Sequence, residues 1–400
     1  MFLRVGLFAV GAGVISCAAV VVLGKLLEYR SDRRLRKDAS RLVEVSPGNF
    51  LNVTISGDGS PIVVLDAGLG MSGLSWHWVQ SKVSPHTRTV TIDRPGLGCS
   101  PAGKGDWMRR VDTIVEWLEA LVSKVPELQG DLILVGHSTS GMHARLFCHR
   151  NPDRVKGIVL VDTAHEAQLG KVEGNSVYNS YPPVEVTEAK LRRLRHLSST
   201  GLLRIMYHCS GPSFMSACRS FPPLVLVLRL LDSLGRAVAI GQRRNIDILG
   251  PHFPPALRRR FEDEQLSVAG MAAMIAEHGS QRASMEYMQS LAILRPGQLG
   301  PRPLVVLSRD PAVGAGGRLY PGARGDPARE GQHAALQREL AALSSDAVHA
   351  EVRGAGHGSL LFVDADATAT AAAVLDVVAA VRSAAPVADV RRRRLEGGRS

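Results

Sequence analysis

The stretch Leu132-Ile-Leu-Val-Gly-His-Ser-Thr-Ser-Gly141 decides the fold. It begins with a short apolar run typical of a buried strand, and the residues that follow it have helical spacing. A serine on a sharp strand-to-helix turn projects its hydroxyl above the edge of a sheet, and such a turn needs small residues two positions before and after the serine. Gly136 and Ser140 occupy these positions, so we predict that Ser138 is a nucleophile.

Short apolar segments of the same kind recur on both sides of this stretch. They alternate with helical segments, which predicts an α/β fold with a mostly parallel central sheet flanked by helices. A leading hairpin is expected at 42–56, turning near Pro47-Gly48-Asn49. The predicted buried strands are Ile62–Leu65, Thr89–Ile92, Leu132–Val135, Gly157–Val161, Leu304–Leu307 and Val348–Val352, and the predicted helices are 74–84, 108–125, 139–150, 329–343 and 364–382.

The alternation stops between residues 165 and 300, where helical segments rich in Leu and Arg dominate. We interpret this interval as a helical cap inserted between two strands of a core formed by 42–164 and 301–383. The remaining segments are residues 1–41, an anchor with its basic flank, and residues 384–400, whose run of arginines predicts a basic disordered tail.

Residues 5–24 contain no charged side chain. A helix of that length spans about 30 Å, the thickness of the hydrocarbon core of a bilayer. A cleaved signal peptide has a shorter apolar region that ends at a small-residue cleavage site, so we favour a single transmembrane anchor. The basic residues from Lys25 to Lys37 follow this span, and the positive-inside rule then places the rest of the chain on the cytosolic side of the membrane.

The formal net charge of +11 is concentrated at 25–41 and 391–400. A nucleic-acid-binding protein would carry a basic face on its folded domain, so we exclude that class and expect an affinity for anionic lipid headgroups. The five cysteines are scattered and form no Cys-x-x-Cys pair. They support neither a disulfide framework nor a metal site, and no metal or organic cofactor is expected.

A glycine-flanked histidine, His357, lies between the last predicted strand and the last helix. A loop of this kind lets an imidazole reach back to the nucleophile, so we predict that His357 is the general base. The base needs a carboxylate partner at the end of a strand. Asp162 follows the strand before the insertion and Asp310 follows the strand after it, and the residues alone leave both open.

Acyl transfer also needs backbone donors for the oxyanion that forms during the reaction. The N–H group of Thr139, next to the nucleophile, is one candidate. The other is the N–H group of Leu69 in the loop Asp66-Ala-Gly-Leu-Gly70, where glycines let the backbone approach a ligand. The loop lacks the Gly-Lys-Ser/Thr sequence of a phosphate-binding loop, so we discount that interpretation.

Several motifs together resemble the α/β-hydrolase superfamily, most of all its lipase-like and esterase-like members, over residues 42–383. They are Asp66-Ala-Gly-Leu-Gly70, Trp76, Asp93-Arg-Pro-Gly-Leu-Gly-Cys-Ser100, Gly136-His-Ser-Thr-Ser-Gly141, Val159-Leu-Val-Asp-Thr-Ala-His-Glu166 and Gly356-His357. The resemblance implies a Ser-Asp-His triad and the oxyanion donors named above. The pattern around Asp162 favours that residue as the acid, whereas the wider superfamily favours Asp310. Asp66 and Ser140 depart from the usual His and Gly.

Serine at the nucleophile position points to an acyl-enzyme and away from the aspartyl-ester chemistry of dehalogenases and epoxide hydrolases. We therefore expect a hydrolase acting on a small-molecule carboxylic ester, and the predicted anchor together with the apolar stretch 221–231 suggests a lipid-like one. Two alternatives remain open. One is a catalytically impaired, membrane-tethered binding or scaffold protein, and the other is an acyltransferase or peptidase that uses the same triad.

Overall fold

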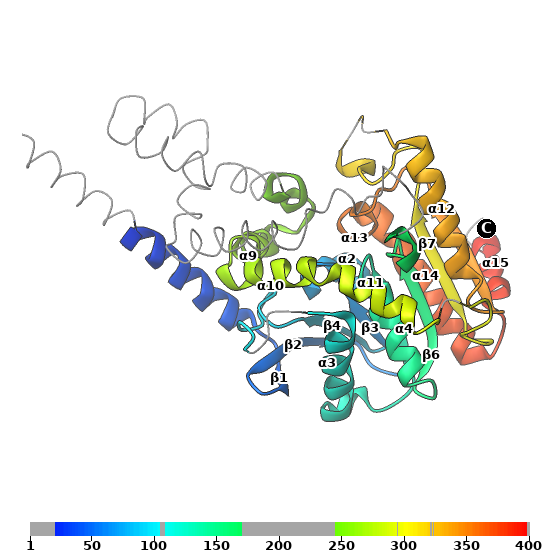
Figure 1. The fold of residues 1–400 in the computed structure, drawn as a ribbon, viewed down its shortest axis with the longest axis horizontal. Helices are drawn as coiled ribbons and strands as arrows, with labels where there is room; N and C mark the ends of the chain where they lie inside the picture. Colours follow the sequence, from blue (N-terminus) through cyan, green and yellow to red (C-terminus); the bar gives the residue numbers. More distant parts are fainter. Residues whose placement is uncertain are drawn as a thin grey trace, which may run out of the picture. The chain divides into compact units, whose positions relative to one another are not determined.

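The computed structural model describes residues 21–104, 109–169, 245–293, 295–320, 322 and 324–397 (Figure 1). The chain divides into two compact units. One comprises Met1–Asp38 with Val184–Ile275, and the other comprises Ala39–Pro183 with Ala276–Ser400. The second unit contains the sheet and all the residues predicted above to carry chemistry.

The second unit is built on one eight-stranded sheet with the order β1-β2-β4-β3-β5-β6-β7-β8. The hairpin β1–β2 is antiparallel and β2 is antiparallel to β4, while all other neighbours are parallel. The predicted α/β arrangement is confirmed. The strands are β1 (Leu42–Ser46), β2 (Asn49–Ser56), β3 (Ile62–Asp66), β4 (Thr89–Asp93), β5 (Leu132–His137), β6 (Val155–Val161), β7 (Leu304–Arg309) and β8 (Ala347–Val352).

Helices cover both faces of this sheet, and every residue of the central strands β3 and β5 is buried. Covered strands read as continuous apolar runs, which is why the sequence revealed them so clearly. On one face α3 and α4 pack together. On the other, α14 lies so close to β6 that a Cβ atom on Gly157 would fall 2.4 Å from Val377. These helices and their neighbours are α2 (His77–Val83), α3 (Val111–Lys124), α4 (Ser140–Arg150), α12 (Pro327–Ala341), α13 (Ser359–Phe362) and α14 (Asp364–Ser383).

The carboxyl ends of the parallel strands lie at one edge of the sheet. Residues 137, 161, 309 and 352 end β5, β6, β7 and β8, which are hydrogen-bonded neighbours in that order. Parallel neighbours in register bring the loops that follow them together, and this is the usual place for a site in an α/β sheet. The segments that contain Ser138, Asp162 and His357 are three of these loops.

The described part of the insertion between β6 and β7 contains helices joined by turns and no strand. It contains η3 (Glu166–Leu169), the helix at 245–249, η4 (Gly250–His252), α9 (Pro255–Gln265), α10 (Val268–Gly279) and α11 (Gln281–Ser290). Residues 170–244 of the predicted cap, with the apolar stretch 221–231, lie outside the described residues. From Ala276 onward the insertion belongs to the same unit as the sheet, which is earlier than the predicted boundary at 300.

Most of the predicted membrane anchor lies outside the described residues, which begin at Val21 in a helix that runs to residue 38. Val22, Leu23, Leu26 and Tyr29 of this helix are exposed. Within the described part of the chain, no single helix is long and apolar enough to cross a membrane. The helices α14 and α15 (Val387–Gly397) together have the length and composition of a span, but they are bent by 120° at the break between them, and half of the residues of α14 are buried. The anchor and its orientation stay predictions.

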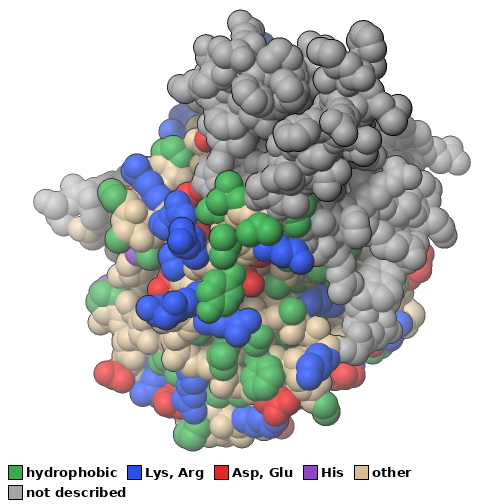
Figure 2. Space-filling view, turned by 90° about the vertical axis from the view of Figure 1, so that its left-hand side faces the viewer, with side chains coloured by type: hydrophobic (Ala, Val, Ile, Leu, Met, Phe, Trp, Pro, Cys, Tyr) green, Lys and Arg blue, Asp and Glu red, His purple; other side chains and the backbone are tan. Residues whose placement is uncertain are grey.

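The side chains exposed on one face of the molecule are mixed in character. Figure 2 shows Lys and Arg side chains interspersed with hydrophobic ones on that face, with few acidic ones among them.

The predicted disordered tail at 384–400 is wrong for most of its length, because Val387–Gly397 forms the helix α15. The buried carboxylate of Asp376 on α14 accepts hydrogen bonds from Arg394 Nε at 2.6 Å and Nη2 at 2.9 Å, and from Arg391 Nη1 at 3.2 Å. Val387 is fully buried as well. A run of arginines looks like a solvated tail in the sequence, but here two of them neutralise a carboxylate that the core would otherwise leave unpaired.

Replacing this carboxylate should release α15. We predict that Asp376→Asn lowers the free energy of unfolding by about 2 kcal/mol, the usual contribution of charged hydrogen bonds. Limited trypsin digestion should then cut after Arg391 and Arg394 much faster than in the wild type. Asp389→Asn is the matched control, because its pair with Arg392 is exposed on both sides. Equal digestion rates in the two variants would refute the role of Asp376.

Candidate active site

Ser138 lies on the predicted tight turn between β5 and α4. Its φ angle is 56°, a left-handed conformation that non-glycine residues seldom adopt and that marks strained functional positions. A Cβ atom on Gly136 would fall 2.5 Å from the carbonyl oxygen of Ser140, so only glycine fits there. The turn therefore holds Ser138 at the carboxyl edge of the sheet in one conformation.

Ser140 departs from the glycine expected two positions after the nucleophile, and its hydroxyl has a partner. Its Oγ donates a short hydrogen bond to the carbonyl oxygen of Ala67, and the side chain is fully buried. The bond ties the turn to the loop after β3. A Cβ atom on the neighbouring Gly141 would fall 2.5 Å from Thr163, so the small residue that the turn requires on this side is supplied one position later.

The imidazole of His357 is paired with Asp162. Its Nδ1 atom lies 2.6 Å from Oδ2 of Asp162, which is fully buried and has a φ angle of 46°. A carboxylate only accepts hydrogen bonds, so Nδ1 carries the proton and the lone pair remains on Nε2, the atom that a general base needs. The structure thus brings two of the predicted site residues into direct contact.

Asp310, the other aspartate predicted as a candidate acid, is not paired with His357. Its Oδ1 accepts from the N–H of Ala312 at 2.9 Å and its Oδ2 accepts from the N–H of Gly354 at 2.8 Å. Both bonds close loops at the carboxyl edge. Asp310 therefore shapes the backbone just before His357 and does not orient the imidazole.

His137 supports the position of His357. The two rings lie 4.5 Å apart between centroids, and Nε2 of His137 is 3.0 Å from the carbonyl oxygen of His357. Burial, with a smaller effect of His357, lowers the pKa of His137 to about 3. The ring is therefore neutral, and its Nε2–H donates to that carbonyl. Among the described residues, neither Nδ1 of His137 nor Oγ of Ser138 has a hydrogen-bond partner.

Asp162 has two further partners that the sequence did not reveal. Arg309, the last residue of β7, donates from Nη1 to Oδ2 at 2.9 Å and from its backbone N–H to Oδ1 at 3.1 Å. Nε2 of His333 on α12 lies 2.7 Å from Oδ1. Burial alone would raise the pKa of Asp162, but Arg309, His333 and the bond to His357 lower it well below its ordinary value. The carboxylate therefore stays ionised.

The loop after β3, predicted to supply an oxyanion donor, lies against Ser138. A Cβ atom on Gly68 would fall 3.0 Å from Cβ of Ser138. The loop turns back on itself through a bond from the N–H of Met71 to the carbonyl of Gly68. Among the described residues, no acceptor binds the N–H of Leu69 or of Thr139, so both predicted donors remain available to a ligand.

Arg94, in the motif that follows β4, holds this loop in place. Its buried guanidinium donates to Oδ1 of Asp66 at 2.6 Å and to the carbonyl oxygens of Ala67 and Gly68, both at 2.8 Å. It also pairs with both carboxylate oxygens of Glu277 on α10, at 2.6 and 2.9 Å. The two carboxylates raise the pKa of Arg94 against the opposing effect of burial. Arg94 therefore has a structural role.

The partners of Asp66 explain why an aspartate stands where the resemblance expects histidine. One of its oxygens accepts from Arg94, and the other lies 2.7 Å from Nδ1 of His143 on α4. Glu277 completes the arrangement by accepting from the N–H of Gly70 at 2.8 Å. A histidine at 66 would leave Arg94 with one fewer carboxylate inside the protein.

Removing Arg94 should both destabilise the fold and disorder the loop. We predict that Arg94→Met lowers the free energy of unfolding by about 3 to 5 kcal/mol, because two buried carboxylates lose their partner. Arg88→Met is the control, since Arg88 pairs with the exposed Asp58 and should cost at most about 1 kcal/mol. Urea unfolding followed by circular dichroism measures both. Equal losses would show that Arg94 is not a special constraint.

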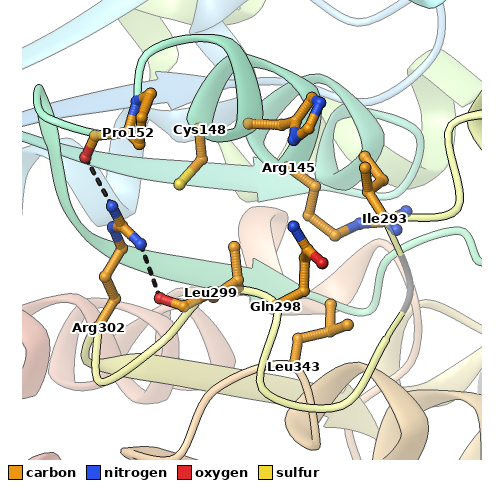
Figure 3. A pocket seen from close by; sticks show the side chains of 9 residues that line it. Arg145, Cys148, Pro152, Ile293, Gln298, Leu299, Arg302 and Leu343 are labelled. Carbon is orange, nitrogen blue, oxygen red and sulfur yellow. Dashed lines mark hydrogen bonds between the residues drawn. The ribbon is translucent and has the colours of Figure 1, made fainter.

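A cavity of about 230 Å³ lies away from Ser138, beside the start of β6 (Figure 3). Its charged groups are occupied. Arg302 donates to the carbonyls of Pro152 and Leu299, and Arg145 donates from Nη1 and Nη2 to the two carboxylate oxygens of Glu166. Burial raises the pKa of the Cys148 thiol, which weakens it as a nucleophile. We assign no chemistry to this cavity.

Within the described residues, no group of His, Cys, Asp and Glu is arranged to hold a metal ion.

Comparison with known proteins agrees with the observed fold. A family model described as alpha/beta hydrolase fold matches residues 61–184. The Cif epoxide hydrolase from Acinetobacter nosocomialis superimposes with a TM-score of 0.57 at 14% identity, covering 88% of this chain and 96% of that one. The chain has the α/β-hydrolase fold.

Curated relatives are more distant over the whole length. The uncharacterized protein YbdG of Bacillus subtilis is 26% identical over 201 residues, which are 48% of this chain and 58% of that protein. The pimeloyl-[acyl-carrier protein] methyl ester esterase of Aeromonas salmonicida is 31% identical over 101 residues, which are 25% of this chain and 37% of that enzyme. The matched parts cover less than two thirds of each of these relatives, so their activities do not transfer directly to this chain.

Proposed function

We propose that this protein is a serine hydrolase that cleaves a carboxylic ester through an acyl-enzyme on Ser138. The observation that carries the proposal is the pairing of His357 with a buried, ionised carboxylate at 2.6 Å, at the same sheet edge as a serine on a strained turn. Serine, acid and base then follow one another along the chain in the order of this fold. The likeness to an esterase in one relative supports the ester as substrate.

The first half of the proposed reaction transfers the acyl group. Nε2 of His357 takes the proton of Ser138 Oγ as that oxygen attacks the carbonyl carbon of the ester. The resulting oxyanion accepts hydrogen bonds from the N–H groups of Leu69 and Thr139. When the tetrahedral intermediate collapses, the bond to the alcohol oxygen breaks and the leaving alkoxide takes the proton from His357.

The second half releases the acid. His357 removes a proton from a water molecule, which attacks the acyl-enzyme and forms a second tetrahedral intermediate. Its collapse breaks the bond to Ser138 Oγ, which recovers the proton from His357. Throughout, Asp162 holds the imidazole in one tautomer and stabilises the imidazolium that forms twice in each turnover.

Ser138 and His357 must still move into hydrogen-bonding distance when a substrate binds. Oγ of Ser138 makes no hydrogen bond to His357 among the described residues, and such bonds commonly tighten only in the complex with substrate. The same observation favours a second candidate, a catalytically impaired binding or scaffold protein tethered to a membrane. A fluorophosphonate probe separates the two, because only an activated serine reacts with it.

The triad is tested by comparing two identical substitutions at two aspartates. We predict that Asp162→Asn lowers kcat for a p-nitrophenyl ester about 10⁴-fold, because the imidazole loses its tautomer, and that Ser138→Ala abolishes both turnover and probe labelling. Asp310→Asn should retain most of the activity, because among the described residues the Asp310 carboxylate accepts only from the backbone N–H groups of Ala312 and Gly354, and asparagine keeps one of these two bonds. A large loss in Asp310→Asn with an active Asp162→Asn would overturn the assignment of the acid.

The lipid-like substrate and the membrane location belong to the same proposal. The uncharged segment 5–24 and the basic residues from 25 to 37 support a single-pass anchor with the catalytic unit on the cytosolic side. A lipid-like ester would then reach the site from the bilayer. An acyltransferase with the same triad would pass the acyl group to an added alcohol instead of water, and product analysis with alcohol present distinguishes it.

Membrane attachment should depend on the first segment alone. We predict that the full chain stays in the membrane pellet after alkaline carbonate washing and that deletion of residues 1–24 releases it into the supernatant. In sealed vesicles with a known side outward, protease should reach the catalytic unit only from the cytosolic side. Release of the full chain by carbonate would exclude a transmembrane anchor.

A further inference from the structure

A buried ionic cluster surrounds Asp162, and we call Asp162, Arg309, Glu330 and His333 the acid cluster. Its members come from the ends of β6 and β7 and from α12. Arg309 is the centre. Nη1 binds Oδ2 of Asp162 at 2.9 Å, while Nε and Nη2 bind the two carboxylate oxygens of Glu330 at 2.8 and 3.2 Å. Both carboxylates and the guanidinium are at most 10% exposed.

The position of Arg309 makes its positive charge oppose the protonation of His357, the base of the proposed reaction. Its Nη1 and the Nδ1 of His357 bind the same oxygen of Asp162, so one oxygen atom separates the guanidinium from the imidazole. Each time His357 accepts a proton, its imidazolium adds a second positive charge beside this oxygen, next to the charge of Arg309. Arg309 opposes that charge, while Glu330 partly neutralises Arg309. The interaction passes through a carboxylate that is fully buried, while the imidazole itself is 35% exposed and is partly screened by solvent.

This inference rests on the proposed function and extends it. We propose that Arg309 and Glu330 act as positioning residues that set the lower pH limit of activity, Arg309 by keeping His357 unprotonated in acid and Glu330 by limiting that effect. Neither residue touches the reacting atoms. The balance of their charges decides how acidic the medium can become before His357 is protonated and no longer acts as a base.

The other titratable groups around Asp162 do not replace this pair. His137, at the end of β5, stacks on His357 and is neutral because burial lowers its pKa to about 3. His333 Nε2 lies 2.7 Å from Oδ1 of Asp162 and 3.0 Å from Nη1 of Arg309. Arg309 can only donate, and the shorter contact favours a bond from His333 to the carboxylate. Within the acid cluster, Arg309 and Glu330 are therefore the charged partners that lie beyond the ionised Asp162.

The test is the pH dependence of kcat/KM in three variants of the full chain, with a short-chain p-nitrophenyl ester. Arg309→Met removes the positive charge, the imidazolium of His357 becomes more stable, and the acid limb should move to higher pH by roughly one unit. Arg309→Lys keeps the charge and should restore the wild-type midpoint. Glu330→Gln keeps the acceptor oxygen but removes the compensating charge, so its acid limb should move to lower pH.

Opposite shifts in Arg309→Met and Glu330→Gln support the proposal, because a merely structural effect would lower activity without moving the midpoint in two directions. Shifts in the same direction, or no shift, overturn it. If Arg309→Met does not fold, Glu330→Gln alone decides by the sign of its shift. The titration of the His357 ring, followed by NMR on ¹³C-labelled histidine with His357→Gln for assignment, reads the same midpoint without turnover. An inactive wild type would therefore refute the proposed hydrolysis and still leave this titration to test the cluster.

Discussion

The hydrogen bond between His357 and Asp162 is the interaction on which the site depends. It joins residues that are 195 positions apart, at a distance of 2.6 Å between Nδ1 and Oδ2. Only the parallel register of β6, β7 and β8 brings these loops to one edge. The apolar strands and the helices that cover them therefore act on the chemistry by fixing where two polar side chains meet. Without that contact, Ser138 would be a strained serine beside an unoriented imidazole.

The structure uses the same arrangement on both sides of Ser138. On one side Arg94 lies between Asp66 and Glu277, with His143 on the aspartate. On the other, Arg309 lies between Asp162 and Glu330, with His333 on the aspartate. In each case an arginine at or just after a strand end joins the aspartate of a neighbouring strand to a glutamate of a helix.

These two clusters fix geometry more than they add stability. A buried ion pair gains little net free energy over apolar packing, but breaking it leaves an unpaired charge inside the protein. Such a cluster therefore tolerates few alternative conformations. The first cluster holds the loop that carries the proposed oxyanion donor, and the second holds the acid of the proposed triad. We regard this as the reason for placing so many charges next to one serine.

Much of this could be predicted from the sequence. The strands of the sheet are buried on both faces and read as apolar runs, and the turn at Ser138 has steric demands that only small residues such as Gly136 meet. The choice between Asp162 and Asp310 could not be predicted, because both end strands and only the three-dimensional pairing separates them. Arg309 and His333 gave no signal, since a single charge becomes meaningful only beside its partners.

The C-terminal helix shows the same limit from the other direction. Counted along the chain, its arginines predict a disordered tail exposed to solvent. The buried Asp376 on the preceding helix explains why this segment is an ordered helix instead. Local composition predicts what a segment can do alone. It does not predict what a distant buried charge requires of that segment, and this holds for the acid cluster as well.

The most direct test of the central contact is the proton that His357 and Asp162 share. A strong hydrogen bond between an imidazole and a carboxylate moves that proton far downfield of the amide region in the NMR spectrum. We expect this resonance in the wild type and in Asp310→Asn, and its loss in His357→Gln and Asp162→Asn. A resonance that survives Asp162→Asn and disappears in Asp310→Asn would contradict the account.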